Sequence, residues 1–201
     1  TSNLSISLFG LDAERNSIGF RTNRVDQVDP FTERDLIKGE FNNHGVEVKF
    51  LNNYSFFNLR NVFVIGGKYY RSKSTSKQGP GSSLDDADFE FYLDKFPNYT
   101  NQSDYMYPNE NIALFGENII YITGKISLTP GLRYENILTR SDGSFKQINL
   151  DAAGNVIYNN TTYEKQNSRR SFFLFGLGLS YKPSKDTVSY THLRAHETNW
   201  H

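Results

Sequence analysis

The chain alternates apolar and polar residues with a period of two in several separate segments, and this pattern predicts an all-β protein. Short turns and long polar connections alternate between these segments, which is typical of a barrel with short periplasmic turns and long extracellular loops. The composition agrees, because 13 Tyr and 16 Phe accompany a hydrophobic fraction of only 37% and a mean hydropathy of -0.60. We therefore predict an antiparallel transmembrane β-barrel fragment of about six strands, cut from a larger barrel and a longer chain.

The clearest alternation lies in residues 126–135, after a predicted tight turn at residues 123–125. One face of this strand carries Ile126, Leu128, Pro130, Leu132 and Tyr134. The other face carries Ser127, Thr129, Gly131, Arg133 and Glu135. An apolar face beside a polar face with an ionic pair is the pattern expected when one side meets lipid and the other meets a watery lumen.

Five further segments are predicted to be strands: residues 4–8, 46–50, 62–70, 112–122 and 173–181. In residues 112–122 both faces carry apolar side chains, so periodicity does not assign a lipid face there. The polar connections between strands are long, covering residues 12–41, 72–109 and 140–169. Long irregular loops are uncommon in compact soluble domains, which favours the barrel over a sandwich.

Two other interpretations of the pattern stay open. A soluble β-sandwich carbohydrate-binding module would use the Tyr-rich loops as a sugar platform, and a passive porin-like barrel would lack a plug domain. The formal net charge of +0 argues against nucleic-acid binding. The chain has no Cys, no Ser/His/Asp arrangement of a hydrolase and no phosphate-binding glycine loop, so we expect neither an enzyme nor a bound cofactor or metal.

Two segments carry a resemblance to a known family. The sequences ALFGEN (113–118) and LTPGLRYE (128–135) resemble a barrel hairpin of TonB-dependent outer-membrane receptors, and the wording of residues 96–99 and 148–156 is similar to the ferric-dicitrate type. The resemblance covers residues 1–187 and implies the wall of a plugged, 22-stranded barrel in the outer membrane of a Gram-negative bacterium. It further implies uptake of a ferric chelate (iron-dicitrate or a siderophore) and coupling to the TonB complex through an N-terminal region.

The last residues carry a different resemblance. Residues 188–201, VSYTHLRAHETNWH, look like a translated sequencing-adapter read-through. We therefore predict two parts, a partial receptor barrel at 1–187 and a non-native tail at 188–201. The spacing of His192 and His196 in that tail is accordingly not interpreted as a metal site.

Candidate ligand-binding residues follow from the chemistry of an anionic ferric chelate, which needs cationic and hydroxyl donors. The cationic candidates are Arg15, Arg21, Arg24, Arg71 and Lys73. The aromatic candidates are Tyr99, Tyr105 and Tyr107, for which an interfacial aromatic girdle is the alternative interpretation. Arg133 and Glu135 are predicted to face the lumen, either as an ionic contact with a plug or as a solvated pair in the wall.

Overall fold

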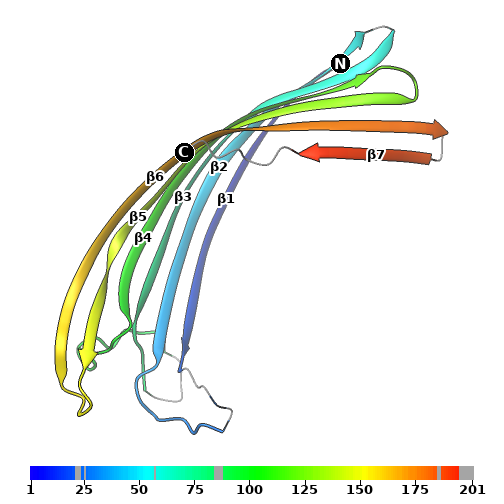
Figure 1. Ribbon diagram of the computed structural model, residues 1–201. Coiled ribbons are helices and arrows are strands. Elements are labelled where there is room, and N and C mark those ends of the chain that lie inside the picture. The colour runs from blue at the N-terminus through cyan, green and yellow to red at the C-terminus, as the bar shows by residue number, and fades with distance from the viewer. Residues whose placement is uncertain (21–23, 25, 57, 84–87, 185–186, 195–201) are drawn as a thin grey trace.

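The computed structural model describes residues 1–20, 24, 26–56, 58–83, 88–184 and 187–194 as a single antiparallel sheet (Figure 1). Seven strands follow one another in chain order, so that each pairs with the next and the sheet does not close on itself. The strands are β1 (Ser2–Gly19), β2 (Asp35–Phe56), β3 (Leu59–Pro80), β4 (Gln102–Tyr121), β5 (Ile126–Leu150), β6 (Val156–Ser184) and β7 (Thr187–Arg194). The prediction of an antiparallel barrel fragment is confirmed, with each of the six expected strands present and β7 added as a seventh.

The strands are much longer than the sequence suggested. Both ends of each segment expected as a long loop are extended and hydrogen-bonded, which leaves residues 20–34, 81–101 and 151–155 as the segments between strands at that end. The expected loop boundaries at 12–41, 72–109 and 140–169 were therefore wrong. The physical reason is that a strand beyond the bilayer meets water on its outer face, so it keeps its ladder but loses apolar alternation.

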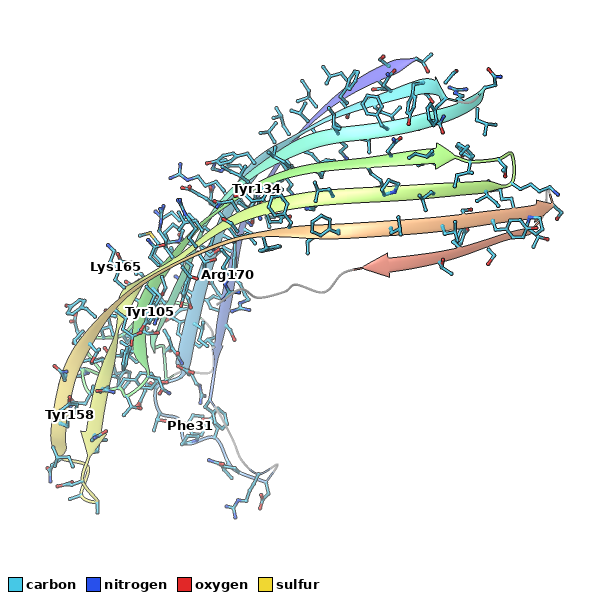
Figure 2. All side chains as sticks on the ribbon, turned by 45° about the horizontal axis from the view of Figure 1, so that its top comes forward. Phe31, Tyr105, Tyr134, Tyr158, Lys165 and Arg170 are labelled. Carbon is cyan, nitrogen blue, oxygen red and sulfur yellow. The ribbon has the colours of Figure 1, made fainter. Side chains whose placement is uncertain are left out.

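The ladder register sorts the side chains into two faces, because residues directly opposite each other in an antiparallel pair share a face. Leu4 pairs with Phe50, Phe50 with Ile65, and Leu132 with Phe175. The face that these residues share is the convex one, on which Tyr134 lies in Figure 2. Its apolar side chains are exposed, with Leu8 at 81% and Phe175 at 60%, because no second layer covers them.

The same register resolves the strand whose faces the sequence left open. Ile112, Leu114 and Ile120 of β4 pair with residues of the convex face, whereas Ala113 and Phe115 lie on the concave face. A β-sandwich needs a second sheet packed against the first. The described residues form a single sheet with few buried apolar side chains, so they do not agree with the soluble β-sandwich alternative. No helix among the described residues has the length and apolarity to cross a membrane.

Short polar side chains fix the turns. At the short-turn end, Thr123 Oγ1 accepts the N–H groups of Lys125 (3.2 Å) and Ile126 (3.0 Å), as the predicted turn requires. Asn61 is fully buried there, and its Oδ1 accepts the N–H of Tyr121 at 2.7 Å, which ties β3 to the end of β4. At the other end, Asp151 accepts backbone N–H groups in the turn that joins β5 to β6. The sequence Pro-Ser-Lys-Asp at 183–186 predicts a further tight turn, but Lys185 and Asp186 are outside the described residues.

Candidate functional site

Charged side chains gather at mid-height on the concave face. Glu47 and Lys49 of β2 form an ion pair of 2.6 Å, and Arg133 and Glu135 of β5 form another of 2.5 Å. Glu135 is only 8% exposed and also accepts a hydrogen bond of 2.8 Å from Asn111 Nδ2 of β4. These charges lie opposite the apolar convex face, so the sheet is polar inside and apolar outside, as a membrane barrel requires.

Two aromatic rings of the concave face each lie opposite a glycine on the adjacent strand and close to a cation. Phe115 of β4 pairs with Gly66 of β3, and Arg133 lies 5.4 Å from the centroid of the Phe115 ring. Phe9 of β1 pairs with Gly45 of β2 in the same way, with Lys68 Nζ 5.0 Å from the ring centroid. A ring that covers a glycine on the adjacent strand pins the register, and the nearby cation adds a cation–π contact.

Above these charges, the concave face carries a pair of stacked tyrosines. Tyr105 and Tyr107 of β4 have ring centroids 5.9 Å apart with planes at 13°, and Tyr105 Oη donates to Glu164 Oε2 of β6 at 3.1 Å. Figure 2 places Tyr105 on the same side of the sheet as Arg170. Successive ladder pairs show that one transverse row of this face contains Arg15, Gly39, Ser76, Tyr105, Gly143 and Glu164.

Neutral hydrogen-bonding groups are frequent in the next rows toward the membrane. One row runs through Asn43, Ser72, Asn109, Thr139 and Ser168. The Oδ1 atoms of Asn43 and Asn109 are buried and have no hydrogen-bond partner in the described part of the chain. An acceptor in this state favours a donor from outside the sheet. The following row ends at Arg170, which pairs with Ile137.

Tyr99 lies in the 81–101 connection, at the end of this surface that is farthest from the membrane. Its hydroxyl donates to Asp35 Oδ1 at 2.9 Å, and both Asp35 oxygens also accept from Gln78 Nε2 at 2.9 Å. Burial, and then the adjacent Asp35 carboxylate, raise the pKa of the Tyr99 phenol well above its ordinary value. Tyr99 is therefore a neutral hydrogen-bond donor at any physiological pH.

The remaining candidates do not join this group. Arg71 and Lys73 lie on the convex face, because they pair with His44 and Asn42 in the rows next to the apolar band. Arg24 is in an exposed part of the 20–34 connection, 3.8 Å from Asp26. Arg21 is outside the described residues. The structure thus brings together Arg15, Tyr99, Tyr105 and Tyr107 on one surface and separates Arg71 and Lys73 from them.

Sequence reasoning missed several residues of the concave surface: Asn43, Asn109, Glu164 and Arg170. The alternation along β6 could have identified the last two, because every second residue of a strand lies on the same face. Arg170 is thus on the same face as Phe172 and Leu174. This alternation becomes readable only when the strand is known to continue back to Val156. Among the described residues, no group of three or more His, Cys, Asp and Glu side chains is arranged to hold a metal ion.

An apolar convex face, a polar concave face and long antiparallel strands define a section of the wall of an outer-membrane β-barrel. The chain belongs to the TonB-dependent receptors, since the family model "TonB dependent receptor-like, beta-barrel" matches residues 2–195. Members of this family are receptors and transporters of the Gram-negative outer membrane, and the localisation predicted from the sequence is thereby confirmed.

Two solved structures have a similar fold. One is the ferric citrate transporter FecA in the unliganded form, with 13% identity and a TM-score of 0.61 over 95% of this chain and 24% of that chain. The other is the ferric yersiniabactin uptake receptor FyuA from Yersinia pestis, with 14% identity and a TM-score of 0.57 over 95% of this chain and 24% of that chain. The chain thus spans about a quarter of either protein. No curated protein matches the sequence.

Proposed function

We propose that this chain forms part of the binding wall of a receptor that imports a ferric chelate, either iron-dicitrate or a siderophore. The observation that carries the proposal is the Tyr105–Tyr107 pair on the concave face, which also carries Arg15 in the row of Tyr105 and Arg170 in a row nearer the membrane. The two proteins of similar fold are named for a ferric citrate and a ferric yersiniabactin, which agrees with this ligand class.

The chemistry of the surface suits such a ligand. A ferric chelate presents a rigid shell of oxygen atoms, which accept hydrogen bonds from hydroxyl, amide and guanidinium groups. Tyr rings add apolar area at a low cost in side-chain entropy. The rows around Tyr105 supply hydroxyl and amide groups with few carboxylates, so an anionic ligand meets little repulsion.

The partners of the whole receptor follow from its family. We propose that a plug domain fills the lumen and that the TonB complex acts through the N-terminal region of the full-length protein. Arg133 and Glu135 lie on the concave face, where a plug would lie against them. Because both are already paired with each other, we assign them a role in keeping the wall polar rather than in binding the chelate.

Uptake of radioactive iron tests the proposal. The full-length receptor is expressed in an iron-starved host that lacks its own ferric chelate receptors, with and without functional TonB. Uptake of ferric dicitrate or a ferric siderophore should require both the receptor and TonB. The Arg15→Gln/Arg170→Gln variant should lower apparent affinity about tenfold, whereas Lys77→Gln/Lys165→Gln on the convex face should not. Uptake of neither chelate, with the receptor present in the outer membrane, would contradict the proposal.

A further inference from the structure

The convex face carries four cations at the upper edge of its apolar band. Arg71 pairs with Glu110 across β3 and β4, and Leu138 of β5 pairs with Arg169 of β6, so these residues share one transverse row. Lys73 and Arg140 lie one step further from the band on β3 and β5. We name the set Arg71, Lys73, Arg140 and Arg169 the cationic belt.

The belt is exposed and its four cations form no ion pairs among the described residues. Arg71, Lys73 and Arg169 are exposed and Arg140 is partly exposed. Within the described residues, none of the four makes an ion pair, although Glu110 and Asp12 lie in the same two rows. Higher on the same face, Lys77 and Lys165 form ion pairs with Asp104 (3.0 Å) and Asp142 (2.9 Å). Lys38 and Lys146 make no ion pair with the described residues there, but Lys38 lies over the Phe91 ring and Lys146 Nζ donates to Pro97 O at 3.1 Å. The four belt cations thus lie together in two adjacent rows without such partners in the described part of the chain.

That height coincides with the expected membrane surface. On β6 the apolar convex residues run from Phe173 to Tyr181, and eight steps of about 3.4 Å cover roughly 27 Å along the strand. After a strand tilt of about 40° this corresponds to roughly 21 Å, close to the ~25 Å apolar band of outer-membrane barrels. Tyr69, Tyr134 and Phe173 mark the upper edge as an aromatic girdle. On β3 the belt begins at Arg71, two residues above Tyr69.

We propose that the cationic belt binds the phosphate groups of an anionic lipid in the outer leaflet. Basic residues just outside an apolar band attract anionic headgroups, and Arg side chains bind phosphate oxygens through two parallel hydrogen bonds. Neighbouring strands lie about 4.8 Å apart, so β3 and β6 are about 14 Å apart and the belt is wide enough for a headgroup with two phosphates. A chelate on the concave face does not reach the belt, because the sheet lies between them.

The site is distinct from the proposed chelate site and does not depend on which ligand is imported. It accounts for Arg71 and Lys73, which the sequence analysis assigned to the chelate and the register assigns to the opposite face. It adds Arg140 and Arg169, which join them only through the strand order β3-β4-β5-β6.

Native mass spectrometry of the full-length receptor tests the inference. The receptor in detergent with EDTA is mixed with bisphosphorylated lipid A, dephosphorylated lipid A or phosphatidylcholine. Wild-type receptor should bind the bisphosphorylated lipid at least tenfold more tightly than either other lipid. Substituting all four belt residues by Gln should abolish that preference. Arg71→Lys/Arg140→Lys/Arg169→Lys should keep most of it, and Lys77→Gln/Lys165→Gln, on the same face, should keep it entirely.

Folding is checked by the heat-dependent shift in gel mobility. If the fourfold variant does not fold, Arg71→Gln/Lys73→Gln and Arg140→Gln/Arg169→Gln are measured separately, and each should lose part of the preference. Inorganic phosphate at millimolar concentration should not compete, because the acyl chains also bind the apolar band. Unchanged preference in the folded Gln variants, or full competition by inorganic phosphate, would overturn the proposal.

Discussion

The ring of Phe115 on β4 lies over Gly66, its direct partner on β3, and leaves no room for a side chain at that position. A Cβ on Gly66 would lie 2.5 Å from Phe115 Cζ and 2.6 Å from the carbonyl oxygen of Val48. The absence of a side chain at Gly66 is thus part of how β3 and β4 keep their register.

Substituting Gly66 by Val should therefore destabilise the full-length receptor. Overpacking of this kind costs about 1–3 kcal/mol, and here the backbone oxygen cannot move aside. The measurement is the temperature at which the barrel loses its folded gel mobility. Gly176→Ala is the matched control on the concave face, because a Cβ there would meet nothing within 4 Å. Equal stability of the Gly66→Val and Gly176→Ala variants would contradict the prediction.

The ion pair between Arg133 and Glu135 should contribute measurably to stability. Glu135→Gln removes the partner of a guanidinium whose side chain is 35% exposed, so solvent screens part of the loss. We expect a loss of about 1–2 kcal/mol in urea unfolding from detergent. A double-mutant cycle with Arg133→Gln separates the pair from the hydrogen bond to Asn111. A coupling energy of zero would show that the pair is only a solvated feature of the wall.

Tyr99 should ionise later than an ordinary tyrosine when the pH is raised. Its folded pKa lies above the ordinary value near 10, so the protonated phenol is the form that the fold favours. The stability that it contributes is complete below about pH 10 and is lost as the pH rises above that value. The absorbance at 295 nm of wild type minus Tyr99→Phe isolates this phenol.

The same measurement has a control in Asp35→Asn. Removing the carboxylate should move the Tyr99 transition to lower pH while leaving the burial of the ring in place. A Tyr99 transition at or below pH 10 in the wild-type receptor would contradict the prediction.

Tyr107 should matter for the affinity of the receptor for its chelate. Tyr107→Ala removes one ring of the stacked pair, and we expect about a tenfold higher concentration for half-maximal uptake with an unchanged amount of receptor. Tyr163→Ala is the control, because that tyrosine is 82% exposed and lies on the convex face. If both variants behave like wild type, the stacked pair does not bind the ligand.

Residues 188–201 remain a prediction of non-native sequence, with 187 as the boundary. β7 begins at Thr187, and the family match extends to residue 195, so part of the tail lies within both. Sequencing the genomic locus should reveal another strand of alternating residues in place of this tail. The same tail read directly from genomic DNA would show the boundary to be wrong.

Sequence alone was enough to predict the antiparallel barrel fragment, the membrane-level segments of six strands and, except in residues 112–122, the lipid face. Residues such as Leu128 and Leu132 alternate with polar or small neighbours because one face of the strand meets lipid and the other meets water. This difference produces a period of two that is visible in the sequence itself. The turn at Thr123 was predictable for a similar reason, since it is made by local hydrogen bonds.

Only the tertiary structure decided which side chains meet beyond the membrane. There both faces touch water, the alternation disappears, and the strand residues 12–19 of β1 and 35–41 of β2 could not be distinguished from loops. The register then places Arg15 with Tyr105 and puts Arg71 on the opposite face. These relationships depend on pairing between strands distant in sequence, and a one-residue shift in register would exchange the two faces.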